Sequence, residues 1–161
     1  MAGIKKEKNY ISTGLIAQNR RAHFDYLINE TYTAGLVLMG TEVKSLRQGH
    51  ANINDAYGIV EDGEIYMANM FIAAYENQGY SSHAERRNRK LLLQHREIAK
   101  IINSLSRKGT TLIAEKMFFD KRGRAKLQIG LGVGKKLYDK RETAKERDWS
   151  REKSRIMSHS I

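Results

Sequence analysis

The chain has 161 residues, a formal net charge of +11 and a pI near 9.9, and it contains no cysteine. This length suits one domain with a short appended segment, and a cationic surplus of this size attracts polyanions such as nucleic acid. The absence of cysteine excludes disulfides, thiolate zinc sites and thiol nucleophiles, and no apolar run approaches the roughly 18 residues that a membrane span needs.

The N-terminal segment, residues 1–18, is expected to be a flexible basic arm. It holds a cluster of lysines near its start and the loose stretch Ser12-Thr13-Gly14. It carries no apolar core of the kind that defines a signal peptide. Together with the missing membrane span, this start predicts a cytoplasmic protein with no membrane partner.

Residues 19–134 hold nearly all of the periodic apolar signal and begin with predicted strands. Phe24, Tyr26 and Ile28 recur with a period of two, which is typical of a strand. The continuous apolar run 35–39 fits a second strand that is buried on both faces.

A short helix and a hairpin follow. Thr41 is suited to cap a helix over 41–48, with Glu42 favourable in its first turn and Gly49 as its stop. The apolar runs of the hairpin are 56–60 and 64–70, on either side of Glu61-Asp62-Gly63. An Asp-Gly pair between two such runs is a strong hairpin signal.

A second helix and a second hairpin complete this region. The helix is predicted from about Gln94 to Arg107, with one apolar face made by Ile98, Ile101, Ile102 and Leu105. The hairpin runs are 112–119 and 124–131, around the turn at 120–123, with Leu127, Ile129 and Leu131 on one face. Many short strands with few short helices predict a mainly β fold, an OB-like closed antiparallel barrel over residues 19–134.

The last segment, residues 135–161, is predicted to be a basic tail that is disordered when free and helical when bound. Basic residues outnumber acidic ones nine to five in it. Helical spacing places Arg147, Arg151 and Arg155 on one ridge. The tail offers only a few i, i+3 ion pairs, and each stabilises a helix by only a few tenths of a kcal/mol. This support is too weak to hold an isolated helix, so the tail is expected to order on its target.

Patterns that would indicate catalysis, a metal or a cofactor are missing. No two of the five histidines have the i, i+4 spacing of a helical metal site, and no Gly-x-Ser-x-Gly elbow occurs. The glycine-rich stretch 130–136 fails the P-loop spacing because no Ser or Thr follows its lysines. We therefore expect no enzyme activity, no cofactor and no metal.

Basic residues gather in clusters, at Arg20-Arg21, at 86–90 and in the tail. One such cluster would be an ordinary solvated loop, but several around one small barrel favour a continuous basic surface that binds RNA. Two alternatives stay open on this reasoning. One is a ribosomal or general single-strand RNA-binding protein, which would bind many RNAs with similar strength, and the other is an RNA-processing enzyme.

Several short motifs stand in order from about residue 13 to the end of the chain. They are Asn19–Ala22, Gly40–Arg47, Arg89–Leu93, and Gly134–Lys136 leading into Asp139–Arg141. Together they resemble the SsrA-binding protein family, also called small protein B, the partner of transfer-messenger RNA. The resemblance implies an OB-like barrel that binds the tRNA-like domain of that RNA and brings it to ribosomes stalled without a stop codon. It also implies that the barrel takes the place of the missing anticodon arm, and that the tail folds as a helix in the decoding centre and the empty mRNA channel.

The resemblance, with basic neighbours added to it, assigns two groups of residues. The RNA-binding group is Asn19, Arg20, Arg21, Glu42, Lys44, Arg47, Lys90, Leu92, Lys126, Lys135 and Lys136. The ribosome-engaging group is Tyr138, Asp139, Lys140, Arg141, Arg147, Trp149, Arg155, Ile156 and Met157. Thr33, Gln94 and Tyr138 depart from residues that are common in the family. The expected partners are transfer-messenger RNA and the ribosome, which the protein would meet as a monomer.

Overall fold

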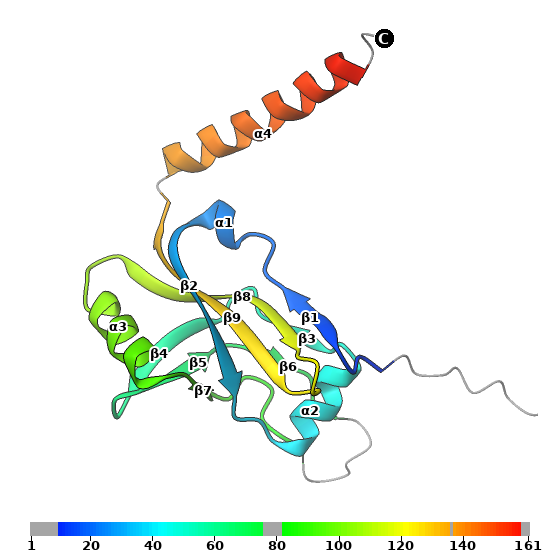
Figure 1. The fold of residues 1–161 in the computed structure, drawn as a ribbon, viewed down its shortest axis with the longest axis vertical. Coiled ribbons are helices and arrows are strands. Elements are labelled where there is room, and N and C mark those ends of the chain that lie inside the picture. The colour runs from blue at the N-terminus through cyan, green and yellow to red at the C-terminus, as the bar shows by residue number, and fades with distance from the viewer. Residues whose placement is uncertain (1–9, 76–81, 136, 159–161) are drawn as a thin grey trace, which may run out of the picture.

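The computed structural model describes residues 10–75, 82–135 and 137–158, with the side chains of 137–143 excepted (Figure 1). The strands are β1 (Gly14–Gln18), β2 (Tyr26–Leu36), β3 (Ala51–Asn52), β4 (Tyr57–Glu61), β5 (Glu64–Ala68), β6 (Phe71–Ile72), β7 (Arg89–Leu92), β8 (Thr110–Phe119) and β9 (Ala125–Gly134). The helices are α1 (Ala22–Asp25), α2 (Gly40–Arg47), α3 (His95–Leu105) and α4 (Leu137–Ser158).

Seven of the described strands form a closed antiparallel barrel, and β3 and β6 pair with each other in a separate two-stranded sheet. Their order in the main sheet is β1-β8-β4-β5-β7-β2-β9, and the ring closes because β8 also pairs with β9. β1 and β4 share the other edge of β8, where Gln18 pairs with Lys116 and Tyr57 pairs with Ile113. The predicted mainly β, OB-like closed barrel is confirmed, with the short helices placed around it (Figure 1).

The barrel interior is filled from alternating positions of its strands. On β9, Leu127, Ile129 and Leu131 are at most 3% exposed, as their spacing predicted. From the facing strands, Ile65 and Met67 of β5 are fully buried in the same apolar cluster. Removing this surface from water is the main stabilising contribution to the barrel.

Both predicted hairpins are present. In the first, Glu61 pairs with Glu64, and the turn residues Asp62 and Gly63 have φ angles of 50° and 73°. Positive φ at both central residues is the geometry of a type I′ turn, which explains the Asp-Gly pair. In the second, the Asp120 carboxylate accepts hydrogen bonds from backbone N–H groups within the turn, which hold its pKa below the usual range.

The N-terminal part of the barrel differs from the prediction. Residues 14–18, assigned to a flexible arm, form β1, because Ile16 and Ala17 pack against the apolar core. Residues 1–9 of that arm lie outside the described residues. Phe24 belongs to the single turn α1, and β2 then runs continuously to Leu36.

The apolar run 35–39 is not a separate buried strand. β2 ends at Leu36, and the side chains of Val37 and Met39 are 44% and 53% exposed. The backbone there is held by a hydrogen bond of 3.1 Å from the Val37 N–H to the Lys90 carbonyl oxygen. A run that passes from a strand into α2 thus places apolar side chains on the surface.

The predicted helices are confirmed within one or two residues at their ends. α2 is followed by Gly49 at a φ of 77°, which stops it as expected. Its N-cap is Met39 rather than Thr41. α3 rests its apolar face on the barrel through Ile101, which is fully buried. No helix in the described residues is long and apolar enough to cross a membrane.

Gly58 is expected to tolerate no side chain, because an added Cβ atom would lie 2.7 Å from the Cβ atom of Leu112. Overpacking of this kind destabilises by roughly 1–3 kcal/mol. Gly58→Ala should therefore lower the midpoint of urea unfolding. Gly40→Ala is the control, since no atom lies within 4 Å of the added methyl group and a helix prefers Ala to Gly. Equal midpoints for the two variants would contradict this packing.

Candidate nucleic-acid interface

The outer face of α2 presents the first group of predicted RNA-binding residues. Lys44 and Arg47 lie about one turn apart, and both side chains are exposed. On the opposite side of the helix, Leu46 and Ser45 are buried, and the Ser45 hydroxyl donates a hydrogen bond of 2.6 Å to the carbonyl oxygen of Ala73. The two cations therefore stand on a helix that is fixed to the barrel.

Glu42 lies beneath this face and has no exposed surface. Its carboxylate pairs with Arg87 and Arg89, and it accepts a hydrogen bond of 2.9 Å from the Met39 backbone N–H. Burial raises the pKa of this carboxyl, but the hydrogen bonds from Arg87, Met39 and Arg89 and the attraction of Arg89 hold the pKa below its usual range. The structure corrects the prediction that Glu42 contacts RNA: it locks α2 to β7 and thereby positions the cations on α2.

Two further buried residues, which belong to neither group predicted from the sequence, help to hold α2 on the barrel. The His83 ring lies 2.9 Å from the Thr41 hydroxyl and 3.0 Å from the Ile72 carbonyl oxygen. Arg89, which the sequence placed in an exposed basic cluster, is fully buried and donates further hydrogen bonds to backbone carbonyl groups. No local pattern distinguishes such residues from surface ones, because their partners are distant in the sequence.

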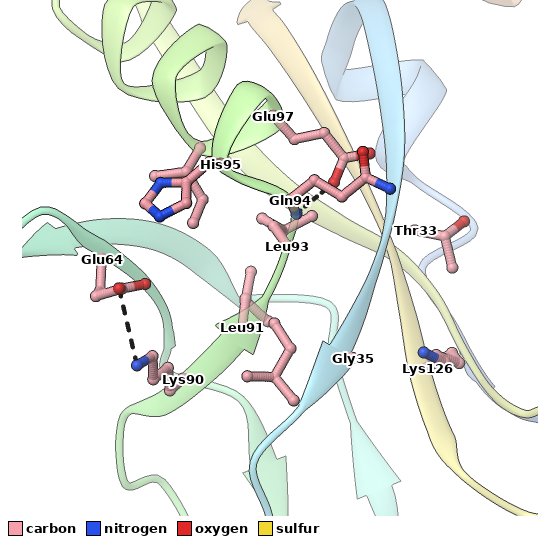
Figure 2. A pocket seen from close by; sticks show the side chains of 12 residues that line it. Thr33, Gly35, Glu64, Lys90, Leu91, Leu93, Gln94, His95, Glu97 and Lys126 are labelled. Atoms are coloured by element: carbon pink, nitrogen blue, oxygen red, sulfur yellow. Dashed lines mark hydrogen bonds and ion pairs between the residues drawn. The ribbon is translucent and has the colours of Figure 1, made fainter.

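A second group of predicted residues meets at a cavity of about 470 Å³ between β2, β7 and the start of α3 (Figure 2). Lys90, Leu92 and Lys126 all line it, and Leu92 is 54% exposed. The Lys90 ammonium lies 3.9 Å from the carboxylate of Glu64. The cavity also takes in the two described positions that depart from common family residues, Thr33 and Gln94.

The third group lies around α1. Asn19 is buried, because its side-chain amide donates to the carbonyl oxygen of Ala114 at 3.2 Å and its Oδ1 accepts from the Arg21 N–H at 3.2 Å. These bonds use Asn19 to shape the turn before α1, and its contact with RNA stays a prediction. The side chains of Arg20 and Arg21 are exposed on this turn.

The base of α4 is tied to α1. The Lys135 ammonium donates a hydrogen bond of 2.9 Å to the carbonyl oxygen of His23. Two guanidinium groups lie near the Phe24 ring, with Arg21 at 5.5 Å and Arg147 at 5.7 Å from its centroid. Contacts of this type contribute roughly 0.5–1 kcal/mol each at exposed sites. Phe24, which the sequence placed in a strand, thus links the barrel to the tail helix.

Beyond its base, α4 extends away from the barrel (Figure 1). Trp149, Ile156 and Met157 are 66%, 62% and 68% exposed, and Arg155 is exposed beside them. Tyr138, Asp139, Lys140 and Arg141 belong to the helix, but their side chains, like all of Lys136, lie outside the described residues. The structure has the tail as a helix; its disorder in the free protein stays a prediction.

The predicted RNA-binding residues do not converge on one spot. Lys44 and Arg47 stand on α2, while Arg20 and Arg21 stand beside α1 at the other end of the barrel (Figure 1). Between these ends lies the cavity with Lys90 and its neighbours. Cations spread over the length of a rigid barrel suit a large folded polyanion rather than a small ligand.

Comparison with known proteins gives the family. The model of the SmpB protein family matches residues 16–159. The SsrA-binding protein of Mesorhizobium japonicum is 54% identical over 142 residues, which cover 88% of this chain and 89% of that protein. The SsrA-binding protein of Bartonella henselae is 50% identical over 154 residues, which cover 96% and 98%. This chain belongs to the SmpB family.

A solved SmpB structure agrees with this result. It is described as "tmRNA-SmpB: a journey to the center of the bacterial ribosome". Its TM-score to this chain is 0.64 with 44% sequence identity, and the match covers 78% of this chain and 86% of that one. The family match at residues 16–159 extends over the barrel and α4 of this chain.

Limited proteolysis of the free protein is expected to cut first after about residue 135. The exposed apolar residues of α4 bury little surface, and the contacts at Phe24 support only its first part. The order of cleavage, followed by mass spectrometry, measures this directly. Cleavage of the barrel before the tail would contradict the prediction that the tail is poorly ordered in the free protein.

Proposed function

We propose that this protein binds the tRNA-like domain of transfer-messenger RNA (tmRNA, SsrA) and delivers it to stalled ribosomes for trans-translation. The observation that carries the proposal is membership of the SmpB family together with the cations exposed on α2 and beside α1, at opposite ends of the barrel. The relatives are named SsrA-binding proteins, and the related solved structure is described by tmRNA, SmpB and the bacterial ribosome.

The barrel is the tmRNA-binding part. Lys44 and Arg47, the cavity with Lys90 and Lys126, and the basic turn before α1 would hold the RNA by its shape and backbone. Neutralising roughly 6–10 phosphates makes affinity steeply salt-dependent, by about 10³–10⁵-fold between about 50 and 200 mM salt for duplex DNA. We expect tmRNA binding to fall with salt in the same manner.

The tail is the ribosome-engaging part. α4 leaves the barrel at α1, carries a basic ridge, and keeps Trp149, Ile156 and Met157 exposed for a partner. In this proposal the barrel stands in for the anticodon arm that tmRNA lacks, and α4 enters the decoding centre and the empty mRNA channel. Ribosomal RNA supplies the polyanion that the arginines of α4 would meet there.

The protein acts as an adaptor in this proposal. It binds and positions RNA in the cytoplasm as a monomer, and the chemistry of peptide transfer belongs to the ribosome. The alternative function, that of an RNA-processing enzyme, predicts that the purified protein cleaves RNA in the presence of a divalent metal ion.

A rescue assay tests the proposal. Ribosomes stalled at the end of an mRNA without a stop codon are supplied with aminoacylated tmRNA, with and without this protein, and transfer of the nascent peptide to tmRNA is measured. We expect transfer only when the protein is present. Equal transfer without it would overturn the proposed delivery function.

A further inference from the structure

A cavity of about 390 Å³ opens beside α2, between the two cations of its outer face and residues that belong to no group assigned above. It is lined by Tyr10, Ile11, Ser12, Lys44, Arg47 and Tyr75. Two of these are the cations on α2, and two are tyrosines from segments that lie far apart in the sequence. Pockets for small ligands occupy roughly 300–1,000 Å³, so this one suits a single nucleotide rather than a paired helix.

The walls of this cavity are held in place by hydrogen bonds to α2 and its neighbours. The Ile11 N–H donates to the Arg47 carbonyl oxygen at 2.6 Å, which fixes the segment that carries Tyr10. On the other side, the Ser45 hydroxyl donates to the Ala73 carbonyl oxygen two residues before Tyr75. The Tyr75 N–H in turn donates to the Ser82 hydroxyl at 3.1 Å. The cavity is therefore a built feature of the fold.

Aromatic rings and cations meet in it. The Lys44 ammonium lies 5.4 Å from the centroid of the Tyr75 ring, and Tyr10 is 58% exposed. Among the described residues that line the cavity, none carries a carboxylate. Aromatic faces stack on nucleobases, and nearby lysine or arginine pairs with the phosphate of the same nucleotide.

We propose that this cavity binds one unstacked nucleotide of the bound RNA, with its base on the ring of Tyr75 and its phosphate paired with Lys44 and Arg47. The inference rests on the proposed function, because the RNA is then tmRNA. It adds stacking of an unpaired base to a surface that otherwise contacts RNA by shape and charge. The buried pairing of Glu42 beneath α2 keeps the cations at the correct place for this contact.

Affinity for tmRNA, measured with the full chain, tests the role of the ring at position 75. Tyr75→Leu removes the aromatic face and should weaken binding by roughly 5- to 150-fold, the range for loss of one base stacked on an aromatic side chain. Tyr75→Phe keeps the ring and should restore most of the affinity. The salt dependence should be unchanged in Tyr75→Leu but less steep, by about one unit of log–log slope, in Lys44→Gln. Affinity of Tyr75→Leu equal to that of the wild type would overturn the proposal.

Fluorescence gives a second measurement that does not depend on loss of affinity. The chain has one tryptophan, so Tyr75→Trp in a Trp149→Phe background places the only indole in the cavity. Added tmRNA should quench its emission by stacking, whereas the Trp149→Phe chain gives the baseline. Binding of tmRNA without quenching would overturn the proposal.

The outcomes separate this inference from the proposed function. If the wild type shows no preference for tmRNA over ordinary tRNA, the proposed function fails, while quenching at position 75 by a single-stranded RNA oligonucleotide would still support the cavity. If Tyr75→Leu binds tmRNA normally but fails in rescue, the cavity serves a ribosomal partner and the proposal is wrong.

Discussion

Replacing Glu42 with glutamine is expected to lower the free energy of unfolding by about 3–5 kcal/mol. Glu42 and Arg89 are both fully buried and paired with each other, and Arg87 binds the same carboxylate. Removing the anion leaves a guanidinium buried without its counter-charge, which is the most destabilising way to disrupt such a pair. Urea unfolding of wild type and variant measures the difference.

The pH dependence of stability is a second consequence of this pair. The folded-state pKa of Glu42 lies below its value in the unfolded chain, which is about 4.3, so the unfolded state binds more protons at acidic pH. The stabilisation that ionised Glu42 contributes is fully present above its pKa in the unfolded chain, and it is lost as the pH falls through its pKa in the folded protein. Wild-type stability should therefore decline more steeply below about pH 5 than that of Glu42→Gln.

Glu64→Gln is the matched control. Glu64 pairs with Lys90 at 3.9 Å, and both side chains are 37% exposed, so this change should lower stability by only about 0–1 kcal/mol. Replacing Glu42 and Arg89 together with apolar residues should recover part of the loss, because no charge is then left unpaired between them. Equal losses for Glu42→Gln and Glu64→Gln would contradict the buried position of Glu42.

Replacing Trp149 and Ile156 with alanine is expected to abolish rescue of stalled ribosomes while leaving tmRNA affinity unchanged. Both side chains are exposed on α4, which extends away from the barrel. Side chains that are hot spots of an interface, among which Trp is enriched, cost about 2–4 kcal/mol each when truncated, which corresponds to roughly 30- to 1,000-fold in affinity. Equilibrium binding to tmRNA and peptide transfer on stalled ribosomes are measured for the same protein.

Two control variants separate the role of the tail from that of the barrel. Ser150→Ala, next to Trp149 and also exposed, should keep both properties. Combined replacement of Lys44 and Arg47 by glutamine should reduce tmRNA binding first, and rescue only as a result. If tmRNA binding and rescue fell together in the Trp149 and Ile156 variant, the division between barrel and tail would be wrong.

Most of the barrel could be predicted because its signals are local. The hairpin at Asp62-Gly63 needs only two residues with positive φ, and Leu127, Ile129 and Leu131 show their common face directly by spacing. β1 was missed because its apolar content is a short stretch between polar neighbours. Its stability comes from pairing with β8, which is distant in the sequence.

The site residues could be predicted only where a charged side chain is in fact exposed to solvent. Lys44 and Arg47 are exposed as expected, whereas Glu42 and Arg89 are buried against each other across 47 positions of sequence. A carboxylate in the first turn of a helix looks the same in sequence whether it faces solvent or an internal arginine. Family resemblance pointed to Glu42, and the structure gives it a positioning role instead of a contact.

The measurement that most directly tests this account is equilibrium binding to the tRNA-like domain of tmRNA, at physiological salt and with excess ordinary tRNA as competitor. Since the charge of the barrel attracts any RNA, only specific recognition survives that competitor. We predict nanomolar-range binding that persists in its presence. Binding that ordinary tRNA removes would contradict the account and favour a general RNA-binding protein.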